Sequence, residues 1–182
     1  MDPVADLTVR FGLTLLLGSA AGHKLRDARR FRASVESYAI VPRSLAAPVA
    51  ALLIAGEVLL ALSLVAACVA PALRAASLVG AAALLVLYAA AILVNLARGR
   101  RHLDCGCAGP AARRPISGAL VTRNLLLAGA ALLASGEIAA RPFEGVDALT
   151  VVAAVAAGSA LYAAIDHLLA QAPLRNAVRG EA

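Results

Sequence analysis

Two cysteines separated by one glycine are the residues best suited to do chemistry. Cys105 and Cys107 flank Gly106, which lacks a β-carbon and so permits the tight turn that a disulfide across this spacing requires. His102 and the two arginines before it favour the thiolate form, whereas Asp104 opposes it. A small strained ring is easily reduced, as redox-active disulfides are. The spacing therefore predicts a redox dithiol.

Two other interpretations of this loop stay open. A metal site would use His102, Asp104, Cys105 and Cys107, whose side chains are suitable ligands, but the Cys-x-x-Cys spacing of structural zinc is absent and we expect no metal. The pair could also belong to an inert structural loop. The third cysteine, Cys68, is expected to be a small buried core residue near the opposite face.

Glu57 lies close to the middle of a long apolar run. An unpaired carboxylate there is costly inside a membrane, so it must pair with a cation, be protonated or face water. Arg10, Lys24 and Arg123 are the candidate partners. A polar contact that fixes helix packing is the simpler interpretation, and a proton or ligand site is the alternative.

Several further polar residues fall toward the same predicted ends of the apolar runs as the cysteine pair. They indicate a polar pocket, although the ends of membrane helices are polar in any case. They are His23, Lys24, Asn95, His102, Arg123, Asn124, Asp166 and His167.

Membrane-spanning helices must position these residues. Of the 182 residues, 62% are apolar and 15% are charged, against about 25% charged in a soluble domain. One core of this size cannot bury so much apolar surface, so an ordinary soluble enzyme, a disordered chain and a coiled coil are excluded. Alanine- and leucine-rich runs without period-two alternation predict an all-α integral membrane bundle. Five spans are predicted, over residues 7–25, 44–70, 73–96, 116–139 and 146–169.

A short amphipathic helix is predicted between the first two runs. Apolar residues recur there at helical spacing while the arginines point elsewhere, which is typical of a helix on the membrane surface. The helix is expected to stop at Pro42, and its apolar residues are Ala28, Phe31, Val35 and Tyr38.

The net charge of +6 has a topological explanation. Most of the 17 lysines and arginines lie in the first link, the third link and the tail, which five spans place on one side. The positive-inside rule then puts the amino terminus outside a bacterial inner membrane, and the carboxyl terminus and the cysteine loop at the cytoplasmic face. No motif accompanies the charge that would indicate a nucleic-acid partner.

A set of motifs lies along about residues 8 to 140. The motifs are Arg10, Gly22-x-Lys24, Phe31, Tyr38, Pro42, Glu57, Gly99-Arg100, Asp104-Cys105-Gly-Cys107-x-Gly109, Pro115-Ile-Ser117 and Arg123-Asn124. Together they resemble the methylamine utilisation protein MauE family, whose wider relatives are the DoxX-like membrane proteins, and the Asp-Cys-Gly-Cys box is the most specific part of the resemblance.

The resemblance implies a four-helix membrane domain over residues 1–140, and this chain departs from the family by an additional transmembrane helix and tail over residues 141–182. It implies that Cys105 and Cys107 are the redox pair, and that Lys24 or Arg10 pairs with Glu57 before Arg123 does. Its characteristic polar set is Arg10, Lys24, Glu57, Arg123 and Asn124.

The family also implies a thioredoxin-like periplasmic partner and a role in maturing an exported protein. That role contrasts with the cytoplasmic loop predicted above, and a carrier that moves electrons from one side to the other would reconcile them. The alternative is a non-enzymatic structural or assembly subunit bound to other membrane proteins, so whether the chain is an enzyme stays open. We expect no cofactor, because a quinone-linked thiol oxidase would need a quinone pocket near the cysteines and no aromatic-rich stretch indicates one.

Overall fold

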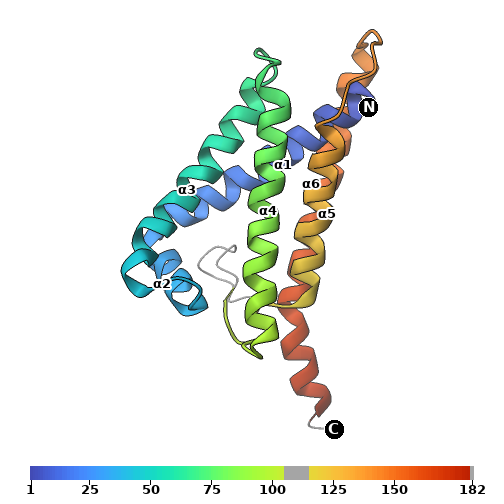
Figure 1. The fold of residues 1–182 in the computed structure, drawn as a ribbon. Coiled ribbons are helices and arrows are strands. Elements are labelled where there is room, and N and C mark those ends of the chain that lie inside the picture. The colour runs from blue at the N-terminus through green and yellow to red at the C-terminus, as the bar shows by residue number, and fades with distance from the viewer. Residues whose placement is uncertain (105–114, 181–182) are drawn as a thin grey trace.

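The computed structural model describes residues 1–104 and 115–180, and all the regular elements in this part of the chain are helices (Figure 1). This confirms the predicted all-α class. The helices are α1 (Pro3–Arg26), α2 (Ala28–Tyr38), α3 (Arg43–Ala66), α4 (Leu73–Ala97), α5 (Gly118–Ala134) and α6 (Gly145–Gly180).

Among the described residues, four helices are long and apolar enough to cross a membrane, namely α1, α3, α4 and residues Gly145–Ile165 of α6. The chain is therefore a multi-pass membrane protein with a helical bundle fold. Helix α5 is apolar but has only 17 residues, or about 26 Å at 1.5 Å per residue, slightly less than a hydrocarbon core of about 30 Å. The run predicted over 116–139 thus ends early, because Ser135 and Gly136 terminate the helix and no helix follows until Gly145.

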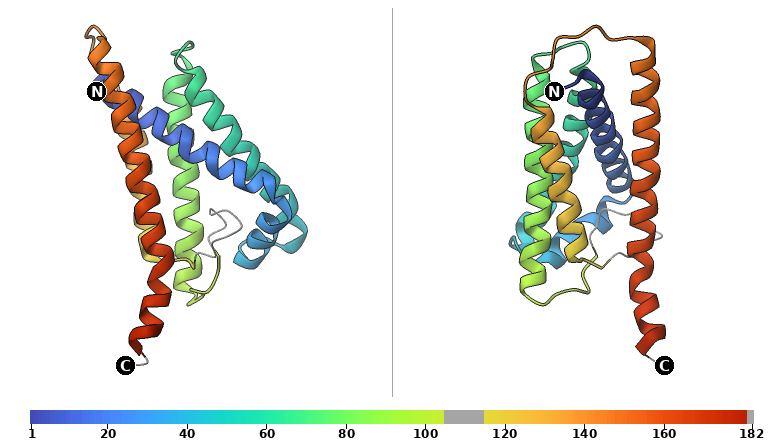
Figure 2. Two further views of the ribbon diagram at one scale, coloured as in Figure 1. Left: turned by 180° about the vertical axis from the view of Figure 1, so that it is seen from behind. Right: turned by 90° about the vertical axis from the view of Figure 1, so that its right-hand side faces the viewer.

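The bundle consists of α1, α3, α4 and α5, with α6 packed against α1. Helix α4 packs along α5 and also contacts α3, while α1 crosses the bundle against α3 (Figures 1 and 2). The central cluster draws on all four core helices and includes Leu17, Leu64, Leu78, Leu85 and Ala131. Many of its members are alanines, whose small side chains let the backbones approach closely where no hydrophobic effect drives association.

Helix α2 lies across one end of the bundle, next to the carboxyl-terminal end of α4 (Figure 1). Asp27 ends α1 and also caps α2, because its side chain accepts a hydrogen bond from the Arg30 amide at 3.0 Å. Phe31 is the buried residue of α2 and packs with Ile54 of α3. The predicted amphipathic helix is confirmed, but it ends at Tyr38 and not at Pro42, because Ala39 adopts the left-handed conformation with φ of 50°.

The prediction that Cys68 is a buried core residue is wrong. The apolar run continues to Ala70, but α3 ends at Ala66, so Cys68 lies in the turn before α4 and is exposed. The Arg10 guanidinium donates a hydrogen bond to its sulfur at 2.9 Å. Hydropathy alone missed this because a turn within apolar sequence carries no polarity signal.

Candidate functional site

Three side chains from three helices form a polar cluster inside the bundle. Lys24 of α1 makes an ion pair with Glu57 Oε1 of α3, and the Tyr88 hydroxyl of α4 donates to the same oxygen at 2.7 Å. Lys24 Nζ also donates to the Tyr88 hydroxyl at 3.1 Å. The exposed fractions of Lys24 and Glu57 are 3% and 0%. The expectation that Glu57 pairs with a cation is confirmed, and of the three candidates the partner is Lys24.

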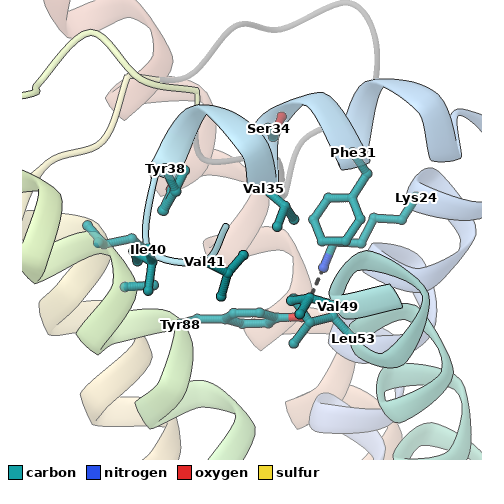
Figure 3. Close-up of a pocket in the computed structure, with 12 residues that line it drawn as sticks. Lys24, Phe31, Ser34, Val35, Tyr38, Ile40, Val41, Val49, Leu53 and Tyr88 are labelled. Atoms are coloured by element: carbon teal, nitrogen blue, oxygen red, sulfur yellow. Dashed lines mark hydrogen bonds between the residues drawn. The ribbon is translucent and has the colours of Figure 1, made fainter. Parts of the chain in front are cut away.

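Aromatic rings surround the ammonium group of this Lys24–Glu57–Tyr88 cluster. Lys24 Nζ lies 4.6 Å from the centroid of Phe31 and 4.8 Å from that of Tyr88 (Figure 3). Both contacts favour the cation through the electron-rich faces of the rings. Glu57 Oε2, in contrast, is buried without a hydrogen-bond partner among the described residues. The charges of Lys24 and Glu57 thus balance, while Glu57 Oε2 remains able to accept a hydrogen bond.

A cavity of about 130 Å³ opens beside the cluster, between α2, α3 and α4. Lys24 forms its polar end, and most of the remaining wall is aliphatic or aromatic (Figure 3). The lining residues are Lys24, Phe31, Ser34, Val35, Tyr38, Ile40, Val41, Val49, Leu53, Tyr88, Ala91 and Ile92.

The two ends of the cysteine-bearing loop meet beside this cavity in what we call the loop stem, Leu103, Asp104, Pro115 and Ile116. Ile116 N donates to the Leu103 carbonyl at 2.9 Å, and Asp104 and Pro115 form an isolated antiparallel bridge. Leu103 and Ile116 are buried in a cluster with Ile92, and Tyr38 packs against it. Two of those neighbours, Ile92 and Tyr38, also line the cavity.

Charge fixes the loop stem to α2. Arg30 forms an ion pair with Asp104 at 3.2 Å, and both side chains are partly exposed. Cys105 follows Asp104 directly in the sequence, but Cys105 and Cys107 lie outside the described residues. Their predicted redox role, and the metal site that would share them, stay predictions. Among the residues that the structure describes, no group of three or more His, Cys, Asp or Glu side chains could hold a metal ion.

Gly99 and Arg100 connect the end of α4 to α2. Gly99 adopts φ of 73°, a conformation that glycine takes at little cost. The turn brings Arg100 back to the carbonyls at the end of α2, where it donates to Ser37 at 2.7 Å and Tyr38 at 3.1 Å. These carbonyls belong to the last turn of a helix and need donors from outside it. Arg100 also donates to the fully buried Asn95 at 3.1 Å, so one side chain fixes the wall that carries Tyr38.

The predicted polar set is not gathered at one place. Arg10 lies toward the opposite end of the bundle, where it pairs with Asp6 at 3.3 Å and donates to the Leu64 carbonyl at 3.1 Å. Arg74 binds the other oxygen of Asp6 at 2.9 Å. Asp6 and Arg10 are 1% and 5% exposed. This second buried network braces α1, α3 and α4 away from the cavity.

The remaining predicted residues serve other contacts. The Arg123 guanidinium lies 5.0 Å from the ring centroid of Tyr162, which joins α5 to α6. Asn124 is buried, and its Nδ2 has no hydrogen-bond partner in the described parts of the chain. His102 is exposed. Of the described members of the polar pocket expected from the sequence, Lys24 is the one that lines this cavity.

Sequence reasoning missed three residues. Tyr88 belongs to the central cluster, and Asp6 and Arg74 complete the second network. A hydroxyl in the middle of an apolar span was a usable signal for Tyr88, of the same kind that singled out Glu57. Asp6 lies one helical turn before Arg10, which is the spacing at which charged residues meet on a helix.

Comparison with known proteins gives one consistent result. The family model of the methylamine utilisation protein MauE matches residues 2–136. The methylamine utilization protein MauE of Paracoccus denitrificans is 36% identical over 163 residues, covering 89% of this chain and 86% of the relative. The MauE protein of Methylophilus methylotrophus is 37% identical over 178 residues, covering 92% of this chain and 87% of the relative. That of Methylorubrum extorquens is 38% identical over 135 residues, covering 74% and 69%. No solved structure gives a significant match.

Proposed function

We propose that this chain, which belongs to the MauE family of methylamine utilisation proteins, is a membrane thiol–disulfide redox protein. Its reacting groups would be Cys105 and Cys107. They would exchange electrons with a thioredoxin-like partner protein, and this exchange would support the maturation of an exported protein. The name of its relatives, methylamine utilization protein MauE, supports a role in methylamine utilisation.

The proposed reaction is thiol–disulfide exchange. One thiolate of the loop attacks a disulfide of the partner, which forms a mixed disulfide and releases one partner thiolate. The second loop cysteine then attacks the mixed disulfide, so the loop becomes oxidised and the partner leaves as a dithiol. Run in reverse, the same two steps oxidise the partner and reduce the loop.

The observation that carries this proposal is the loop stem. The hydrogen bond between Ile116 and Leu103 and the burial of both residues hold the two ends of the loop at one point on the bundle. A reactive pair needs fixed placement as well as access, and the stem fixes the two ends of the segment in which the pair lies in the sequence. The partly exposed Arg30 beside Asp104 adds positive charge where the cysteine segment begins.

We further propose the inner membrane of a bacterium as the location, with the amino terminus outside and the carboxyl terminus in the cytoplasm. Helix α4 separates the exposed Cys68 from the loop stem. Its 25 residues span roughly 37 Å at 1.5 Å per residue. Cys68 and the loop stem therefore lie near opposite faces, and we expect no direct disulfide between Cys68 and the cysteines of the loop.

Differential alkylation tests the redox proposal. In the Cys68→Ser variant, both remaining cysteines should be protected after mild oxidation and both should be labelled after mild reduction. Cys105→Ser and Cys107→Ser should each leave the other cysteine freely labelled. Free labelling of both cysteines in oxidising buffer, or protection that a chelator removes, would contradict the proposal.

A second candidate is a non-enzymatic assembly subunit, which one observation favours. Only 6% of the spanning part of α6 is buried within the chain, against 28–39% for the other spans. That surface faces lipid or another membrane protein. If the Cys105→Ser, Cys107→Ser double variant still supports maturation of the client protein, the subunit role replaces the redox role.

A further inference from the structure

An open apolar groove runs along the amino-terminal half of α3, where α2 and Leu25 at the end of α1 border it. We call it the α3 groove. Its volume is about 790 Å³, which is about five times that of a cavity that holds one benzene molecule. The groove therefore has room for a flexible hydrocarbon chain.

Small side chains give the α3 groove its length. Ala47, Ala51 and Ala55 line it at four-residue spacing, so they lie on one face of α3, and the lining continues to Leu59. The distance from Ala47 to Leu59 is about 18 Å at 1.5 Å per residue. Half of a hydrocarbon core of about 30 Å is about 15 Å. The groove thus spans the depth of one leaflet of the bilayer.

Two arginines of α2 border the α3 groove, Arg29 and Arg32. Nearly all of the wall is apolar, so these arginines contribute their methylene stems, while their guanidinium groups extend toward water and the lipid headgroups. Arg32 shares its charge with Glu36 at 2.8 Å, and its side chain is 55% exposed. Arg29 is exposed and forms no ion pair with any described residue. Arg29 can therefore bind an anion.

The wider charge around α2 also favours an anionic ligand. Residues 26–43 carry five arginines and two acidic residues. Both carboxylates are engaged, since Asp27 caps α2 and Glu36 pairs with Arg32. Basic clusters on amphipathic helices at a membrane surface attract anionic headgroups. An apolar helix of another protein could fill the groove, but it would leave the positive charge of Arg29 without a counterion.

We infer that the α3 groove is a binding site for an anionic phospholipid. The phosphate binds Arg29 and Arg32, and one acyl chain lies along Ala47, Ala51 and Ala55. The bound lipid holds α2 against α3 from the outside, as the packing of Phe31 does from within. The site is independent of the proposed redox function, because no cysteine takes part in it.

Lipid binding to the purified full chain in detergent tests the inference. The probes are dioleoyl phosphatidylglycerol, which is anionic, and dioleoyl phosphatidylcholine, which is zwitterionic. A third probe, sn-glycerol 3-phosphate, offers the phosphate without acyl chains. The readouts are the dissociation constant from native mass spectrometry and the rise in melting temperature on binding.

Two variants remove the two parts of the site. Arg29→Gln combined with Arg32→Gln removes the phosphate contact, and Ala51→Leu fills the groove. The matched controls are Arg101→Gln and Ala90→Leu, because both residues are exposed and lie outside the groove.

An arginine near a membrane surface adds about fivefold to the affinity for an anionic lipid. Since Glu36 partly neutralises Arg32, the wild type and both controls should prefer phosphatidylglycerol to phosphatidylcholine about tenfold. The double arginine variant should lose this preference. Ala51→Leu should weaken the binding of both lipids about fivefold or more, because the acyl chain loses its place.

Three results would overturn the inference. The first is a wild type without preference for the anionic lipid, or a folded double arginine variant that keeps the preference. The second is binding of sn-glycerol 3-phosphate as tight as that of phosphatidylglycerol, which would make the site one for free phosphate. The third is a dimer that Ala51→Leu dissociates, which would assign the groove to a second copy of the chain. The arginine arm decides the matter even if Ala51→Leu does not fold.

Discussion

Removing one member of the Lys24–Glu57 pair should destabilise the bundle by several kcal/mol. Lys24→Met leaves a carboxylate that is 0% exposed with Tyr88 as its remaining hydrogen-bond partner, and Glu57→Leu leaves an ammonium that is 3% exposed. Breaking a buried pair by deleting one partner costs about 3–5 kcal/mol, because the other charge stays buried without compensation. Two opposite unit charges 4 Å apart attract each other by about 4 kcal/mol at an effective dielectric constant of about 20, which is an energy of the same size.

The double variant Lys24→Met, Glu57→Leu distinguishes this reasoning from a simple packing effect. With both charges removed and similar volumes retained, no unpaired charge remains, so the loss should be smaller than in either single variant. The double-mutant cycle should therefore give a coupling energy of about 2 kcal/mol or more.

The free energy of unfolding can be measured by denaturation in mixed micelles, followed by circular dichroism. Glu144→Ala is the control, because Glu144 is exposed in the link before α6 and should change stability by less than about 0.5 kcal/mol. Single variants within about 1 kcal/mol of the wild type, or a double variant that loses the sum of the two single losses, would refute the reasoning.

Three further outcomes follow from positions outside the cavity. Ala39→Gly should stabilise the protein by about 1 kcal/mol, because a φ of 50° costs glycine less than alanine. The control Ala33→Gly, inside α2, should destabilise the protein by about 0.5–1 kcal/mol. Equal effects of the two substitutions in thermal melts would contradict this. Hydrogen bonds from Arg141 and then from a backbone amide lower the pKa of Asp2, so this pair should add stability above about pH 3.9 and lose it as the pH falls through the lowered pKa. Arg141→Gln should reduce the fall in melting temperature as the pH drops below about 3.9. An unchanged fall in melting temperature would show that other groups cause it. An impermeant maleimide should label Cys68 from outside intact cells; labelling only after lysis would reverse the proposed orientation.

The helices themselves were predictable from the sequence. Apolar runs and helical spacing located each helix that the structure describes, since burial in lipid demands long apolar stretches and α2 shows one apolar face. The ends were less certain. The end of α3 at Ala66 and the exposure of Cys68 depend on where a turn interrupts continuous hydrophobicity, and hydropathy does not record that.

The candidate site was predictable only in part. A charge in the middle of a span must find a partner, so the pairing of Glu57 could be expected and its candidates narrowed to three. Which candidate it meets depends on how α1 crosses α3, whereas Arg10 pairs with Asp6 one turn before it on the same helix. The cavity depends on side chains from three helices at once, so no single stretch of sequence could indicate it.

The Lys24–Glu57 pair has a consequence for how the chain enters the membrane during synthesis. Its two charges emerge from the ribosome in different helices, and a lone charge at the centre of an inserting helix costs about 2.5–3.5 kcal/mol. Lys24 lies near the end of α1, so its side chain can reach the headgroup region before α3 is inserted. Glu57 lies well inside α3, and its shorter side chain cannot reach the headgroup region. Insertion of α3 should therefore depend on α1 being already in the bilayer. Biogenesis would then follow the order of the chain, with α1 acting as an internal chaperone for the helix that carries the carboxylate.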